Sequence, residues 1–110
     1  MVESEISVHD AHALDGALLL DVREINEWTA GHIPGAVHVP MSSLRADHDV
    51  LADRSRPIVC ICRSGNRSRM VTDALLDGGW HATNMVGGMK AWAAAGFPVV
   101  DNFDNAGIVI

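Results

Sequence analysis

Residues 57–68 read PIVCICRSGNRS, an apolar run that stops at Cys62 and is followed by six small or polar residues. The apolar part has the length and the β-branched content of a buried strand, which we expect over residues 58–61. A turn at residues 64–66 and a helix over 68–76 follow, and Gly78-Gly79 end that helix. The segment therefore predicts a strand, a tight turn and a helix, with Cys62 at the junction.

The same alternation extends outward in both directions. Further strands are expected at 17–22, 36–39 and 84–86, and further helices at 7–14, 24–30, from 42 or 43 to about 52, and 89–95. Strands that alternate with helices predict an α/β fold with a parallel sheet and helices on both faces. In such sheets ligands bind beyond the carboxyl ends of the strands, which is where Cys62 is placed.

Length and composition are those of one globular domain. The chain has 110 residues, of which 48% are hydrophobic and 20% charged. We expect a single domain over 1–110, with its core at about 6–100 and a C-terminal tail at 101–110. The net charge of −6 argues against a nucleic-acid partner, because phosphate neutralisation needs a basic face.

Two cysteines in a chain without a recognisable signal peptide indicate a reducing compartment. Residues 1–5 contain neither a positive charge nor an apolar stretch, and apolar runs such as 17–20 are too short to cross a bilayer. We expect a soluble, cytoplasmic protein with no membrane association.

The loop after the strand favours an ionised thiol. Its N–H groups can form an anion-binding nest, and the helix that follows adds a partial positive charge. Arg63 and Arg67 add full charges, and residues 57–72 contain no acid. These effects favour a thiolate at Cys62. A solvated surface loop is the alternative interpretation of this basic segment.

The remaining loop residues fit the same purpose. Gly65 permits a positive φ, and Ser64, Asn66 and Ser68 can form local hydrogen bonds. The spacing Cys62-x4-Arg67 is one residue shorter than the Cys-x5-Arg loop of protein tyrosine phosphatases. A smaller ring of amides suits one sulfur carried on the cysteine better than it suits phosphate.

Cys60 is interpreted differently, because it lies inside the apolar run. We expect a core residue there, although a redox pair with Cys62 stays open.

The loop resembles that of rhodanese-type sulfurtransferases. Two further stretches agree: LLDVRE (19–24) with EW (27–28) and GHIPGAVHVP (31–40), and GGMKAW (87–92). The resemblance runs from about residue 6 to residue 100. It implies a five-stranded, mostly parallel sheet flanked by helices on both faces. It also implies that Cys62 takes a sulfur from thiosulfate or a similar small anionic donor, forms a persulfide and passes the sulfur to cyanide or a thiol. The amides of residues 63–68 would hold the persulfide, and no metal or other cofactor is expected.

Several roles stay open at this stage. Arg63 could attract the anionic donor, and Arg67 could do the same or donate to nearby carbonyls. Asp21 and Arg23 lie at the end of the first predicted strand, on the same edge of the sheet as the Cys62 loop. They could form a polar shelf near the site or, in the favoured interpretation, an ion pair that locks the loops. A phosphatase, a persulfide carrier and a non-catalytic partner-binding module are the alternative functions. The donor, the acceptor and the oligomeric state are not determined by the sequence.

Overall fold

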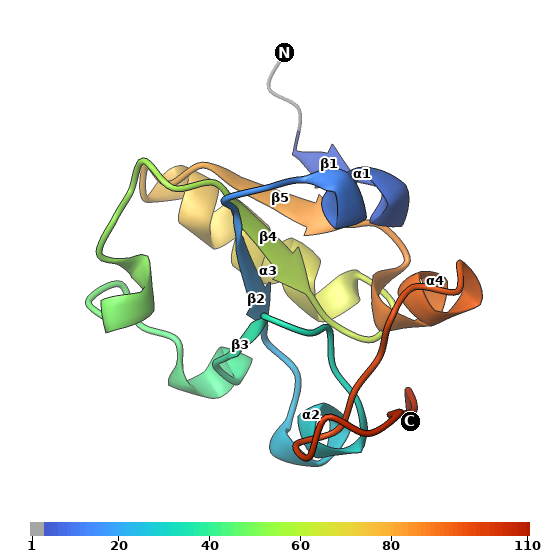
Figure 1. Cartoon of the computed structure of the whole chain (residues 1–110). Helices are drawn as coiled ribbons and strands as arrows, with labels where there is room; N and C mark the ends of the chain where they lie inside the picture. Colours follow the sequence, from blue (N-terminus) through green and yellow to red (C-terminus); the bar gives the residue numbers. More distant parts are fainter. Residues whose placement is uncertain (1–3) are drawn as a thin grey trace.

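A five-stranded parallel sheet forms the centre of the computed structural model, which describes residues 4–110 (Figure 1). The sheet has the order β1-β5-β4-β2-β3, and each pair of neighbours is parallel. The strands are β1 (Glu5–Ile6), β2 (Leu18–Asp21), β3 (Val37–His38), β4 (Ile58–Ile61) and β5 (Ala82–Met85). The predicted fold class is confirmed. Residues 1–3, which belong to the segment searched for a signal peptide, lie outside the described residues.

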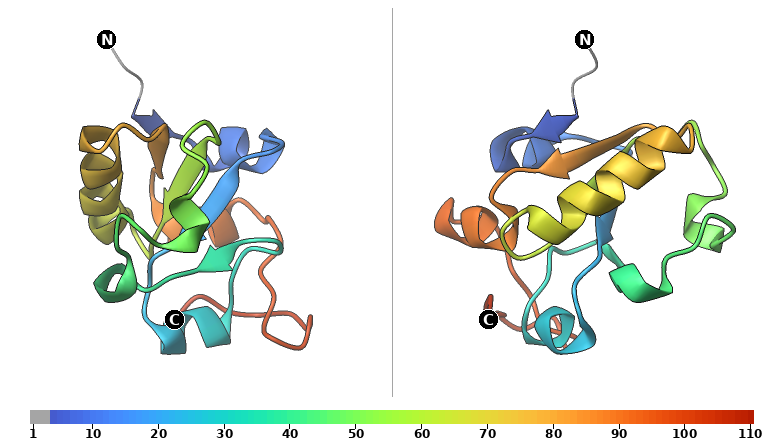
Figure 2. Two further views of the ribbon diagram at one scale, coloured as in Figure 1. Left: turned by 90° about the vertical axis from the view of Figure 1, so that its left-hand side faces the viewer. Right: turned by 180° about the vertical axis from the view of Figure 1, so that it is seen from behind.

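Helices cover both faces of this sheet (Figure 2). Side chains of β4 alternate, so Val59 and Ile61 pack toward α1 (Val8–Ala13) and α4 (Gly88–Ala94). Ile58 and Cys60 pack on the other face, toward α3 (Asn66–Asp77). All four residues of β4 are buried, because the strand is central and covered on both faces.

The prediction of a helix from residue 42 or 43 to about residue 52 is wrong. Two short 3-10 helices, η1 (Met41–Ser43) and η2 (Asp49–Leu51), stand there instead. Leu44 between them has extended backbone dihedrals, and His48 Nδ1 accepts the Val50 N–H at 3.1 Å. This bond from His48 caps η2, which begins as a separate turn.

Other boundaries differ by a few residues. The helix α3 begins at Asn66, two residues before the predicted start, and β5 covers Ala82–Met85 rather than 84–86. The two-residue strand β1 was not expected from the pattern, because it forms only by pairing with β5. The strand predicted at 36–39 shortens to β3.

The carboxyl edge of the sheet is covered by α2 (Ile25–Ala30) and the tail (Figure 1). Val100 forms isolated bridges with His32 and Ala106, and the Ile108 N–H donates to the Ala30 carbonyl at 2.9 Å. The tail, which the pattern left undefined, thus runs along α2 toward the loop after β4. Among residues 4–110, no helix is both long and apolar enough to cross a membrane.

Candidate active site

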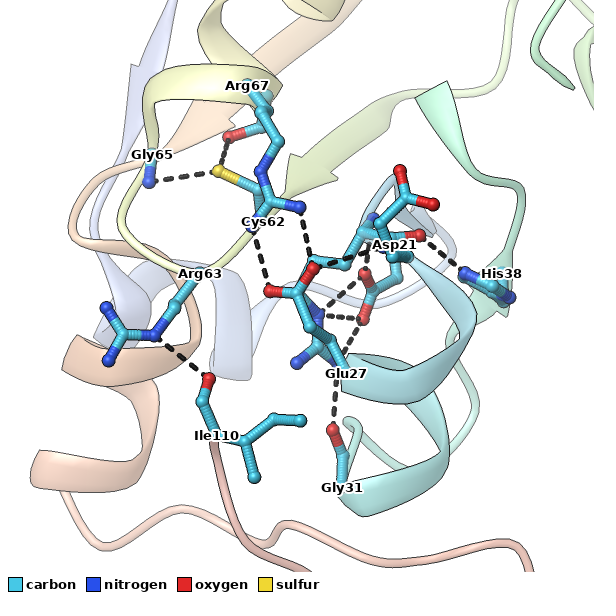
Figure 3. Close-up of polar contacts among 12 residues, drawn as sticks. Asp21, Glu27, Gly31, His38, Cys62, Arg63, Gly65, Arg67 and Ile110 are labelled. Atoms are coloured by element: carbon cyan, nitrogen blue, oxygen red, sulfur yellow. Dashed lines mark hydrogen bonds and ion pairs between the residues drawn. The ribbon is translucent and has the colours of Figure 1, made fainter. Parts of the chain in front are cut away.

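Cys62 lies at the carboxyl end of β4, directly before the turn into α3 (Figure 3). Gly65 caps α3 with φ +106°, a left-handed conformation that side chains rarely adopt. A Cβ on Gly65 would meet its nearest neighbour at 3.6 Å, which is ordinary contact. The dihedral angle, not lack of space, therefore requires glycine.

The sulfur of Cys62 accepts hydrogen bonds from its own loop. The Gly65 N–H donates to Sγ at 3.1 Å, and the Ser68 hydroxyl lies 3.2 Å from Sγ. The residue is only 1% exposed, and burial acts to raise the pKa of its thiol. Hydrogen bonds from the Ser68 hydroxyl and from the amides of Ser68, Gly65 and Ser64 outweigh burial and lower that pKa below its ordinary value. A buried sulfur that faces peptide N–H groups can act as a thiolate nucleophile.

The start of α4 closes the loop from behind. The Met89 and Lys90 N–H groups donate to the carbonyls of Cys62 and Arg63 at 2.8 and 3.0 Å. A Cβ on Gly88 would overlap the Cys62 carbonyl oxygen, so this close approach requires glycine. The Gly87-Gly88 pair is thus a tight turn beside the loop.

The two loop arginines have different partners. Arg67 binds both carboxylate oxygens of Glu27 in α2, at 2.7 and 2.8 Å, and this pair raises the pKa of Arg67 and lowers that of Glu27 (Figure 3). Arg63 is exposed, and its Nε donates to the main-chain oxygen of Ile110 at 2.9 Å. The tail therefore contacts Arg63, the residue that could attract the anionic donor. The other predicted loop residues, Ser64 and Asn66, are exposed.

Asp21 and Arg23 form a buried ion pair rather than an open shelf. Both residues are 0% exposed, and Arg23 Nε and Nη2 donate to the carboxylate at 2.7 to 3.1 Å. Arg23 Nη2 also reaches the Gly31 carbonyl at 2.8 Å, which fixes the end of α2 to the end of β2. Within residues 4–110, Arg23 Nη1 is the buried side-chain polar atom without a hydrogen-bond partner.

Asn84 was missed by the sequence analysis. It lies on β5, is 4% exposed and contacts both Gly65 and Ser68. A polar residue between Ala82 and Met85 was the available signal, but an isolated asparagine in a short strand has many possible explanations.

Cys60 is a buried thiol on the same face of β4 as Cys62. Burial raises the pKa of Cys60 to about 11, so this thiol is neutral at physiological pH. In the part of the chain that the structure describes, no group of three His, Cys, Asp or Glu side chains could hold a metal ion.

Comparison with known proteins places this arrangement in a family. The model of the rhodanese-like domain matches residues 7–95. The chain belongs to the rhodanese-like domain family. A rhodanese-related protein from Thermoplasma volcanium has the same fold, with a TM-score of 0.81 at 31% identity over 88% of this chain and 97% of its own.

Two curated relatives of the rhodanese-like chain are named as sulfurtransferases. Thiosulfate sulfurtransferase 16, chloroplastic, from Arabidopsis thaliana is 37% identical over an alignment 111 residues long with its gaps, which covers 88% of this chain and 92% of the relative. YtwF of Bacillus subtilis, whose name assigns it provisionally to the sulfurtransferases, is 43% identical over 74 residues, covering 67% and 71%.

Proposed function

We propose that this rhodanese-like chain is a sulfurtransferase in which the Cys62 thiolate takes a sulfane sulfur from a small anionic donor such as thiosulfate. The thiolate attacks the outer sulfur of thiosulfate, the S–S bond of the donor breaks, and its electron pair leaves with sulfite. The products are Cys62–S–S⁻ and sulfite, so charge and atoms balance. A thiol or cyanide then attacks the outer sulfur and regenerates the thiolate.

The observation that carries this proposal is the pair of donors on Sγ, the Gly65 N–H and the Ser68 hydroxyl. Donors aimed at a sulfur favour its ionised form, and a pre-ionised nucleophile needs no separate general base. The loop amides of residues 63–68 would hold the outer sulfur of the persulfide. The exposed guanidinium of Arg63 would attract the anionic donor.

The position of Arg67 argues against a phosphatase. A phosphate cradle needs its arginine directed at the anion, whereas Arg67 binds Glu27 through both terminal nitrogens. Arg67 therefore serves to fix α3 to α2. We also propose a reducing compartment such as the cytoplasm, since Cys62 acts as a free thiol.

Intact mass spectrometry after incubation with thiosulfate tests the proposal. We expect a gain of one sulfur atom, its removal by cyanide, and no gain in Cys62→Ala. The matched control Cys60→Ala should still gain the sulfur. A wild-type protein that gains none from several donors would refute the proposal and favour a partner-binding module.

A persulfide carrier is the second candidate, and the 1% exposure of Cys62 favours it, because burial would protect a stored persulfide. A carrier would form the persulfide once and release it slowly to cyanide. An enzyme would instead form thiocyanate over many turnovers, at a steady-state rate that matches the rate at which cyanide removes the sulfur from the persulfide.

A further inference from the structure

Asn84 connects the two residues that donate to the sulfur of Cys62. Its Nδ2 donates to the Gly65 carbonyl at 3.1 Å, and its Oδ1 accepts from the Ser68 hydroxyl at 2.5 Å. The side chain is buried at the end of β5, where Asn84 is the register partner of Cys60. The function proposed above gives this residue no role.

The orientation of the Asn84 amide follows from its neighbours. The Gly65 carbonyl can only accept, so the amide group that faces it must be the NH₂. The amide oxygen is therefore directed at Ser68. A flipped amide would place two oxygens against each other on the Gly65 side.

The Ser68 hydroxyl has one proton and two acceptors within reach. Asn84 Oδ1 lies 2.5 Å from its oxygen and Cys62 Sγ lies 3.2 Å from it. A hydroxyl donates one linear hydrogen bond at a time, so the two acceptors compete for the proton. The charge on the sulfur decides the competition, because bonds to ionised acceptors are the stronger ones.

We propose that Asn84 is a positioning residue that acts through Ser68, by accepting the hydrogen bond of the Ser68 hydroxyl whenever the sulfur of Cys62 is uncharged. This inference rests on Cys62 being the nucleophile. In the free thiolate the hydroxyl points at Sγ. After transfer the charge resides on the outer sulfur of Cys62–S–S⁻, Sγ is a neutral sulfide, and the hydroxyl turns to Asn84 Oδ1.

The alternative acceptor favours sulfur transfer in two ways. It provides a partner for the buried hydroxyl in the persulfide, where an unpaired donor would be costly. It also stabilises the state with an uncharged thiol, which keeps the pKa of Cys62 from falling further. Thiolate nucleophilicity falls as the thiol pKa falls, so this effect preserves reactivity.

We expect the other ionisable groups around the loop to keep their charge when Asn84 is replaced. They come from the strand and loop, from α3, and from α2: Cys60, Arg63, Arg67, Arg69 and Glu27. The buried pair Asp21 and Arg23 lies at the neighbouring end of β2. The Ser68→Ala background separates a change that reaches Cys62 through Ser68 from a direct effect of charge at position 84.

Two substitutions of similar size separate positioning from mere structural support. Asn84→Leu removes the acceptor, so the hydroxyl should stay on the sulfur and the midpoint of Cys62 ionisation should move to lower pH. Asn84→Asp keeps the acceptor and adds negative charge, so the midpoint should move to higher pH. If Asn84 only supported the loop structurally, both substitutions would disturb the loop and move both midpoints in the same direction.

The ionisation midpoint is measured as the pH dependence of Cys62 alkylation by iodoacetamide, followed by peptide mass spectrometry, with no sulfur donor present. Thr83→Ala, a change at the adjacent position of β5, is the control and should leave the midpoint in place. In a Ser68→Ala background the shift caused by Asn84→Leu should vanish. At equilibrium with thiosulfate and sulfite, Asn84→Leu should hold about three- to tenfold less persulfide.

The proposal is overturned if the Leu and Asp variants shift the midpoint in the same direction, or if the Leu shift survives in Ser68→Ala. Should Asn84→Leu fail to fold, Asn84→Ala, which also removes the acceptor, takes its place, and an unchanged or higher midpoint overturns the proposal. Absence of persulfide in the wild type would refute the proposed function only, because the midpoints are measured without a donor.

Discussion

Replacing Gly65 by alanine separates backbone strain from site chemistry. The residue has φ +106°, and a Cβ there would have ordinary contacts only, so the energetic cost comes from the dihedral angle. A non-glycine residue in a left-handed conformation costs about 1–2 kcal/mol. For a domain of this size each kcal/mol lowers the melting temperature by roughly 4 °C.

Relief of that strain should also turn the Gly65 N–H away from the sulfur. Hydrogen bonds to charged groups contribute about 1.5–3 kcal/mol, and a partial loss of about 1.4 kcal/mol corresponds to a tenfold effect. We therefore expect alkylation of Cys62 at neutral pH to slow roughly tenfold. The assay is the iodoacetamide rate, measured beside a thermal melt.

Gly16→Ala is the matched control. Gly16 has φ +80° with no heavy atom within 4 Å of a built Cβ, so its stability cost should be similar. It lies before β2, at the opposite end of that strand from the Asp21–Arg23 pair, and should not change the reactivity of Cys62. If Gly65→Ala lost stability but retained full Cys62 reactivity, the role assigned to the Gly65 N–H would be refuted.

Three further predictions follow from the charged and buried groups. Glu27→Gln should lower the free energy of unfolding by about 1 kcal/mol at neutral pH, as measured in urea titrations. Because the Arg67 pair lowers the folded-state pKa of Glu27, the difference between the two proteins should fade as pH falls through that pKa. A difference that does not depend on pH would contradict the ion-pair explanation. Arg63→Gln should reduce kcat/KM for thiosulfate about three- to tenfold, and the deficit should shrink as salt is added; a salt-independent loss would argue against electrostatic attraction. Cys60→Ala should keep the persulfide yield of Cys62, because burial keeps the Cys60 thiol neutral, while costing about 1 kcal/mol in a melt; loss of the persulfide would instead indicate a redox pair.

The central elements were predictable because their signals are local. The run at 58–61 is apolar over the length of a strand, and glycines 78 and 79 end the helix that follows. Cys62 stands out because it follows a buried strand and precedes a basic loop. By contrast, the pattern at 41–51 predicted one helix, whereas Leu44 is extended and His48 starts a second short 3-10 helix by accepting the Val50 N–H.

The sequence by itself determined the alternation of the central strands and helices, the junction at Cys62 and the family resemblance, because each depends on neighbours within one short segment. Only the tertiary structure decided that Arg67 binds Glu27, 40 residues away, that the tail contacts Arg63, and that Asn84 bonds to Ser68. These contacts join residues far apart in the chain at one edge of the sheet. A hydrogen bond depends on distance and angle in space, and no local pattern of side chains contains either quantity.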